Sequence, residues 1–311
     1  MTQTNAASIA TASQSGNFEH LQEAVTAAER LLHHVKSAAR ERVAAAGGLD
    51  AAQTAAHGLA WFATYVEALR QMLAWGSRLE GEGRYGEMEQ LLVTAAFGEY
   101  LAQLAGGIPM SQGETVRAVT LGVALAEVRR FEDAVADLVA EGCAETTKRR
   151  LAALIAEQPA VTTFGDTGLD ETLSEMRVQM RRFSEAEVLP YAHAWHLSNS
   201  YIPAEVLKKL GELGVFALTL PEEFGGLGLG KEAMCVVSEE LSRGYIGVGS
   251  LGTRSEIAGE LILGAGTEEQ KQKYLPRIAS GEILPTAVFT EPNTGSDLAS
   301  LKTRAIREGD V

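Results

Sequence analysis

Thr290-Glu291-Pro292-Asn293-Thr294-Gly295-Ser296-Asp297 is a stretch dense in turn-forming residues, and it follows an apolar run over residues 283–289. The run carries β-branched and aromatic side chains and is typical of a strand. A strand that opens into such a turn presents backbone N–H groups and hydroxyls at one point, and Gly295 has no Cβ to keep a ligand away. This arrangement suits a flat heteroaromatic ring or a phosphate, although most turns of this composition bind nothing.

Two upstream segments strengthen the ligand-binding interpretation. Residues 266–276 read Gly-Thr-Glu-Glu-Gln-Lys-Gln-Lys-Tyr-Leu-Pro and are followed by Ser-Gly-Glu at 280–282, and residues 220–228 read Leu-Pro-Glu-Glu-Phe-Gly-Gly-Leu-Gly. In this order the three motifs resemble those of the acyl-CoA dehydrogenases. The resemblance covers residues 166–311, a little under half of the 311-residue chain. The glycines at 225–230 do not have the spacing of a dinucleotide fingerprint or a P-loop.

The resemblance implies a mainly α-helical protein with three parts. Residues 1–165 are expected to form a helical extension with a disordered N-terminal tail, because the residues up to about 16 are small and polar. Residues 166–283 correspond to the acyl-CoA dehydrogenase N-terminal helical domain. Residues 284–311 correspond to the first part of the middle β-domain, which in the family continues beyond the position of Val311, so the chain is expected to be truncated there.

Helical spacing dominates the Ala-rich extension. Phe62, Val66, Leu69 and Leu73 fall on one helix face, and a second apolar row lies one position earlier, so this helix is predicted to be buried on a wide face. A second helix is predicted over residues 87–105. A third is predicted from about residue 111 or 114, with Val116, Val119, Val123 and Ala126 on one face. His33 and His34 are adjacent, so they are expected to point to different sides of their helix.

The extension also carries a resemblance of its own. Residues 57–70 and 98–109 resemble the N-terminal extension of one branch of the family, the methylsuccinyl-CoA dehydrogenases. Ordinary acyl-CoA dehydrogenases lack such an extension.

Composition excludes several classes of protein. With 46% hydrophobic and 22% charged residues the chain is typical of soluble globular proteins, and no apolar run has the length of a membrane span. The net charge of −14 argues against nucleic acid and anionic membranes as partners. Cys143 and Cys235 are the only cysteines, which favours a reducing cytoplasm.

The resemblance implies FAD as the cofactor. In the family, the residues matching 287–296 line the flavin, and the candidates here are Ala287, Phe289, Thr290, Gly295 and Ser296. Thr290 matches the threonine that contacts the flavin ring, and Ser296 matches the serine near the flavin phosphates and the substrate. Phe289 is bulkier than the aliphatic residue usual at its position, which departs from the family's ring contact.

No catalytic residue and no metal site are assigned. The family's catalytic glutamate lies beyond the position of Val311, and neither Glu256 nor Glu291 matches it. His193 and His196 are spaced as two ligands on a helix turn, but no third ligand is near them.

Substrate choice is predicted from Arg254. Residues 252–257 match the far end of the family's acyl pocket, where a guanidinium calls for an anionic partner. A substrate carboxylate can supply that partner as a bidentate pair. Alternatively, Arg254 pairs with Glu256 or Glu260, or faces solvent.

With the extension, this predicts an FAD-dependent acyl-CoA dehydrogenase that oxidises (2S)-methylsuccinyl-CoA to mesaconyl-CoA. The resemblance implies an electron-transferring flavoprotein as the electron acceptor and a homo-oligomeric protein. The alternatives are another short-chain acyl-CoA dehydrogenase, a flavin oxidase or monooxygenase of the same fold, and a non-enzymatic helical interaction fragment.

Overall fold

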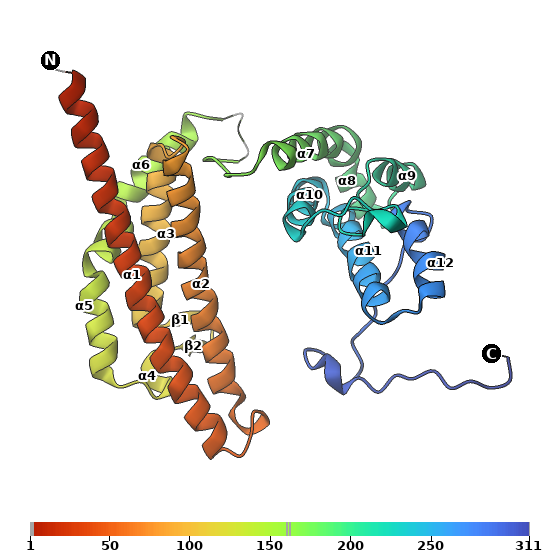
Figure 1. Ribbon diagram of the computed structural model, residues 1–311, viewed down its shortest axis with the longest axis horizontal. Helices are drawn as coiled ribbons and strands as arrows, with labels where there is room; N and C mark the ends of the chain where they lie inside the picture. The colour runs from red at the N-terminus through yellow and green to blue at the C-terminus, as the bar shows by residue number, and fades with distance from the viewer. Residues whose placement is uncertain (1–2, 160, 162, 311) are drawn as a thin grey trace. The chain divides into compact units, whose positions relative to one another are not determined.

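The computed structural model describes residues 3–159, 161 and 163–310, with only the backbone described for residues 3–17. The chain divides into two compact units, Met1–Gly168 and Leu169–Val311. Helices dominate both units, which confirms the prediction of a mainly α-helical protein (Figure 1). The division into three parts at residues 165 and 283 stays a prediction.

The first unit is built on four long helices. In chain order its elements are α1 (Gln3–Ala45), η1 (Asp50–Ala52), α2 (Gln53–Gly81), α3 (Glu87–Gly106), β1 (Ile108–Ser111), β2 (Glu114–Val116), α4 (Ala118–Leu121), α5 (Leu125–Gly142) and α6 (Glu145–Ala156). The helices α1, α2, α3 and α5 contact one another and run alternately up and down (Figure 1). The predicted disordered tail falls on the first turns of α1, whose side chains up to Asn17 lie outside the described residues.

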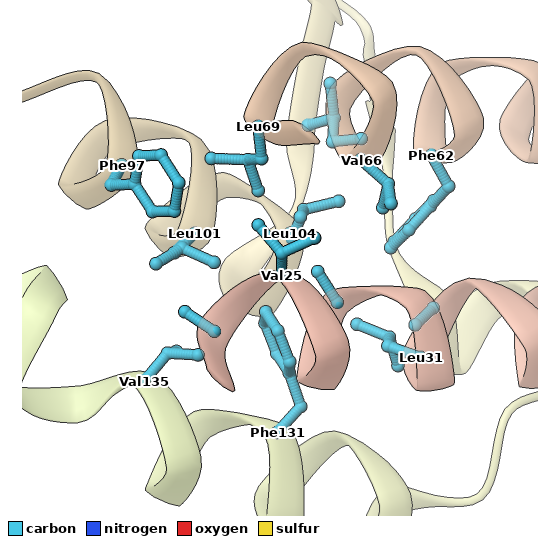
Figure 2. Close-up of a cluster of buried hydrophobic side chains, with 14 of the residues drawn as sticks. Val25, Leu31, Phe62, Val66, Leu69, Phe97, Leu101, Leu104, Phe131 and Val135 are labelled. Carbon is cyan, nitrogen blue, oxygen red and sulfur yellow. The ribbon is translucent and has the colours of Figure 1, made fainter. Parts of the chain in front are cut away.

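The core of this unit lies between those four helices. Figure 2 shows side chains from each of them pointing toward one another, among them Val25, Leu31, Phe62, Val66, Leu69, Phe97, Leu101, Leu104, Phe131 and Val135. The predicted face of α2 is confirmed, because Phe62, Val66, Leu69 and Leu73 are all buried. The predicted second helix is confirmed as α3, and α2 ends at Gly81.

The predicted third helix is wrong at its start. Residues 108–116 form an antiparallel hairpin in which Ile108 lies opposite Val116, and the next long helix, α5, begins only at Leu125. Both paired residues are buried, so the hairpin places apolar side chains in the core. Val119, which the helical spacing placed on the same face, is exposed.

The last residues of the first unit are held to the turn between α2 and α3. The Arg84 guanidinium donates to both carboxylate oxygens of Asp166, at 2.8 and 2.6 Å. The Trp75 indole donates to the Asp166 carbonyl at 3.0 Å, and the Asp166 backbone N–H donates to the Glu89 carboxylate at 2.7 Å. Residues 166–168 therefore belong to this unit.

The second unit is also built of helices, and none of those described is longer than the 20 residues of α11. Its elements are α7 (Glu171–Phe183), η2 (Ser184–Val188), α8 (Leu189–Leu197), α9 (Ala204–Glu212), η3 (Glu222–Phe224), α10 (Lys231–Gly244), α11 (Ile246–Ala265), α12 (Glu268–Ala279) and η4 (Leu298–Ser300). The helix α10 packs on α7 and α11, and α12 packs on α11. A capping box starts α12, with reciprocal hydrogen bonds between Thr267 and Gln270 at 2.9 and 3.2 Å.

Two helical segments of this unit contain residues that usually end a helix. The helix α7 continues past residue 183 through a π-turn, η2, into α8, where Pro190 occupies the first turn and has no N–H that needs a partner. The small-residue stretch after Gly244 is the start of α11. Gly249 allows α11 to approach α10, because a Cβ at this position would lie 2.0 Å from the Ser242 hydroxyl.

The predicted strand over residues 283–289 is wrong within the described residues. The backbone there is extended and its side chains alternate between half-buried and exposed, with Val288 80% exposed. A strand, however, is defined by hydrogen bonds to a neighbour, and no described segment pairs with this one. The side chains of residues 283–289 alternate in exposure as they do in a strand, but within the described residues no neighbouring strand supplies the hydrogen bonds.

Candidate functional site

The turn at residues 291–294 is closed by its own backbone. The Glu291 N–H donates to the Thr294 carbonyl at 2.9 Å, and the Thr294 N–H donates back to the Glu291 carbonyl at 3.1 Å. Thr294 is buried, whereas Gly295 and Ser296 are exposed. The turn therefore has a fixed base and an open tip.

The Glu291 carboxylate holds a second segment against this turn. It accepts hydrogen bonds from the backbone N–H groups of Lys302, at 3.0 and 3.1 Å, and Thr303, at 2.6 Å, and also from the Thr303 hydroxyl. The hydrogen bond from the Thr303 side chain, followed by those from the two backbone groups, lowers the pKa of Glu291. Glu291 therefore acts as a structural clamp, and its carboxylate is fully engaged.

The five predicted flavin contacts lie together along this segment. Ala287 and Phe289 are half-buried on one side of the extended backbone, and Thr290 is exposed where the turn begins. Within the described residues, the hydroxyls of Thr290 and Ser296 have no hydrogen-bond partner of their own. The space beside Gly295 is open, since a Cβ there would meet no atom within 4 Å. The segment thus offers two free hydroxyls and an unobstructed backbone.

The glycine-rich loop of this unit folds back on residues 217–220. The N–H of Leu227 donates to the Ala217 carbonyl at 2.9 Å, and the N–H of Leu229 donates to the Leu218 carbonyl at 2.8 Å. Gly226 is required at its position, because a Cβ there would lie 1.9 Å from the Leu220 carbonyl oxygen. The loop therefore uses these backbone N–H groups to bind residues 217–220, whereas a phosphate-binding loop would leave them free for the ligand.

An apolar hollow of about 460 Å³ lies between this loop, α7 and α10. Its apolar lining residues are Met176, Met180, Leu213, Val215, Leu218, Leu227, Leu229 and Val237. None of the predicted site residues lines this hollow.

Arg254 lies on an exposed part of α11 and is held by the preceding turn. Its Nη1 donates to the Ser250 hydroxyl at 2.5 Å and to the Ser250 carbonyl at 3.1 Å. It pairs with neither Glu256 nor Glu260, because Lys231 from α10 takes both carboxylates at 2.6 Å. Within the described residues Arg254 has no carboxylate partner, and its exposure agrees with the alternative in which it faces solvent.

Within the described residues, the predicted substrate-binding residue Arg254 and the predicted flavin-binding segment do not contact each other directly through polar groups. No hydrogen bond or ion pair connects Arg254 with residues 287–296 in the described part of the chain. Of the two glutamates declined as catalytic bases, Glu256 is bound to Lys231 and Glu291 to residues 302–303. Neither presents a free carboxylate.

Two features of this unit were not predicted. Ser255, next to Arg254, is buried, and its hydroxyl has no partner among the described residues. Glu240 is buried beneath two arginines: Arg177 Nε donates to it at 2.9 Å, and Arg181 donates from Nη2 at 2.6 Å and from Nε at 3.0 Å. The sequence does contain a signal for the burial of Ser255. Gly252 and Gly259 lie three residues before it and four residues after it, on the same helix face.

Residues 170–282 match the family model of the acyl-CoA dehydrogenase N-terminal domain. These residues belong to the acyl-CoA dehydrogenase family. The family predicted from the three motifs is thus confirmed for this part of the chain. In the residues that the structure describes, no helix is long and apolar enough to cross a membrane.

The chain is also similar to individual acyl-CoA dehydrogenases. It is 56% identical over 293 residues to (2S)-methylsuccinyl-CoA dehydrogenase of Cereibacter sphaeroides, a match that covers 93% of this chain and 53% of that protein. It is 36% identical over 155 residues to mitochondrial isovaleryl-CoA dehydrogenase of Solanum tuberosum, covering 49% of this chain and 37% of that protein. The crystal structure of an acyl-CoA dehydrogenase from Geobacillus kaustophilus matches at 34% identity with a TM-score of 0.40, covering 46% of this chain and 37% of that chain. The chain thus spans about half, or less, of the length of these relatives.

Proposed function

We propose that the whole protein is an FAD-dependent acyl-CoA dehydrogenase that oxidises (2S)-methylsuccinyl-CoA to mesaconyl-CoA. The similarity to (2S)-methylsuccinyl-CoA dehydrogenase supports this, because it extends over 93% of the chain and so includes the helical extension as well as the family domain. The observation that carries the substrate assignment is the guanidinium of Arg254, which has no carboxylate partner among the described residues while both nearby glutamates are taken by Lys231.

The geometry around Arg254 favours recognition of a carboxylate. Ser250 binds only Nη1 of the guanidinium, which leaves the edge formed by Nε and Nη2 for a second partner. That edge is the one that pairs with both oxygens of a carboxylate. Holding Nη1 on its own helix also restricts the side chain before the substrate arrives, so less conformational entropy is lost on binding.

The turn at residues 290–296 fits FAD in its chemistry. The free hydroxyls of Thr290 and Ser296 would serve the ring and the phosphate side, and the open space at Gly295 lets a ligand approach the backbone. Ala287 and Phe289 would supply apolar contact to the ring. When bound, FAD would accept the hydride that leaves the substrate's β-carbon. The residues of this chain position the cofactor and the acyl group.

Three further assignments belong to the same proposal. The electron acceptor is an electron-transferring flavoprotein, and the protein is a homo-oligomer, as the family resemblance implies. The compartment is the cytoplasm, which is supported by the free state of both cysteines, Cys143 and Cys235.

The test uses the whole protein, purified and mixed anaerobically with methylsuccinyl-CoA. We expect a bound flavin whose absorbance is bleached by the thioester, and Thr290→Ala is expected to lower flavin occupancy. Val288→Ala is the matched control, because Val288 is next to the turn but its side chain is 80% exposed. A protein that is colourless and takes up no added FAD contradicts the proposal. Rapid reoxidation by oxygen with release of peroxide would favour an oxidase instead.

A further inference from the structure

A second hollow lies in the first unit, between α1 and α5. It has a volume of about 230 Å³, below the range of about 300–1,000 Å³ typical of sites for drug-sized ligands. Its rim carries four groups that are or can become cationic, Arg30, His33, His34 and Arg130. The adjacent histidines, expected to diverge, both line it, with ring centroids 6.1 Å apart.

Among the described residues, Glu127 is the one carboxylate that lines this hollow. Glu127 accepts from Arg130 Nη1 at 2.5 Å and lies 3.3 Å from His34 Nε2, so it is shared between these two groups. The guanidinium of Arg30 and the imidazole of His33 have no hydrogen-bond or ion-pair partner among the described residues. The hollow is therefore locally basic in a chain whose net charge is −14.

The floor of the hollow is apolar. Leu31 from α1 and Phe131 from α5 are part of the buried core and also line the hollow. Figure 2 shows Phe131 pointing from α5 toward α1, the helix that carries Leu31. A small ligand that is anionic at one end and apolar at the other matches this division between rim and floor.

We propose that this hollow binds a small organic carboxylate with a short apolar body. Its carboxylate is held by Arg30 and His33, the two groups without a partner, and its apolar body lies against Phe131 and Leu31. Arg130 and His34 remain on Glu127, which keeps the rim in place. The site lies wholly within the first unit and is independent of the function proposed for the second.

The experiment follows the six histidines of the chain by NMR, with ring-labelled histidine in the full-length chain at neutral pH. The probes are hexanoate, hexanamide and inorganic phosphate. We expect hexanoate to shift the His33 and His34 signals in a saturable manner. Hexanamide, which has the same body without the charge, is expected to bind at least about tenfold more weakly, because hydrogen bonds to charged groups are the stronger ones.

Two variants separate a built site from a general charge effect. Arg30→Gln is expected to weaken hexanoate binding about tenfold. Lys36→Gln removes the same charge from an exposed position on α1 outside the hollow, and it is expected to leave binding unchanged. The proposal is overturned if hexanoate gives no saturable shift, if hexanamide or phosphate binds as tightly, or if the two variants behave alike.

Discussion

Glu240→Gln is predicted to destabilise the second unit strongly. The Glu240 side chain is only 1% exposed, and its carboxylate accepts hydrogen bonds from Arg177 and Arg181, which are 14% and 28% exposed. Glutamine has the same shape but no charge, and its amide N–H₂ would face two guanidinium groups. Both arginines would then lose the buried carboxylate to which they donate.

The expected cost is about 3 kcal/mol of unfolding free energy. Removing one partner of a buried ion pair costs about 3–5 kcal/mol. The lower end applies because Arg177 keeps Glu239 at 3.3 Å, and Arg181 can be partly hydrated. In a domain of this size each kcal/mol shifts Tm by about 2–4 °C, so the unit should melt about 6–12 °C lower.

The assay is denaturant unfolding of the chain, with amide hydrogen exchange of α10 as the readout that is specific to the second unit. Glu239→Gln is the matched control, because Glu239 is next to Glu240 in the chain and also pairs with Arg177, but its own side chain is 63% exposed. Its effect should stay below about 1 kcal/mol, as is usual for exposed ion pairs. A loss of less than about 1 kcal/mol in Glu240→Gln, or one equal to that of the control, refutes the reasoning.

The unfolding free energies of wild type and Glu240→Gln should also differ in their dependence on pH. Burial raises the pKa of Glu240, but the hydrogen bonds from Arg181 and Arg177 outweigh it, so the pKa is lowered from its ordinary value of 4.5. A carboxylate with a depressed folded pKa contributes stability above its unfolded pKa, and this stability is lost as the pH falls through the folded pKa. The advantage of wild type over Glu240→Gln should therefore be complete above about pH 5 and shrink below pH 4.5.

Three further substitutions test other parts of the molecule. Gly142→Ala should cost about 1–3 kcal/mol in denaturant unfolding, because its Cβ would lie 2.2 Å from the Thr94 carbonyl oxygen; an unchanged midpoint would contradict this. Tyr85→Phe should keep or raise stability, because the buried hydroxyl has no partner among the described residues and burial raises its pKa to about 12; a clear loss would reveal a partner. Glu291→Ala should release the backbone N–H groups of Lys302 and Thr303 to faster hydrogen exchange and lower flavin occupancy of the whole protein; unchanged exchange would show that the clamp is dispensable.

The sequence predicted helices where one apolar face repeats and missed structure that depends on contacts between elements. Phe62 and Leu69 were placed correctly because helical spacing alone determines which side of α2 is buried. Val116 and Val119 have helical spacing too, but the pairing of Val116 with Ile108 outweighs it, and spacing does not contain that information. The start of α11 was missed because glycine has a low helix propensity, whereas Gly249 is there to permit contact with α10.

In the candidate site, too, the sequence predicts what is local in the chain and misses what depends on contacts between helices. The flavin contacts proposed at 287–296 follow from the sequence because these residues are contiguous, so a short motif contains all of them. The environment of Arg254 could not, because it depends on Lys231 reaching from another helix to take Glu256 and Glu260. The burial of Glu240 was missed for the same reason, since Arg177 and Arg181, which donate hydrogen bonds to it, lie about 60 residues away along the chain.

The most direct test of the proposed function compares kcat/KM for methylsuccinyl-CoA and isovaleryl-CoA in the whole protein. A charge-assisted hydrogen bond contributes about 1.5–3 kcal/mol, so wild type should prefer methylsuccinyl-CoA by about 10- to 150-fold. Arg254→Leu should abolish this preference, and Arg182→Leu, which removes an exposed arginine from α7, should keep it. Equal kcat/KM for the two substrates in wild type would contradict the proposed substrate, and an intact preference in Arg254→Leu would contradict the role of Arg254.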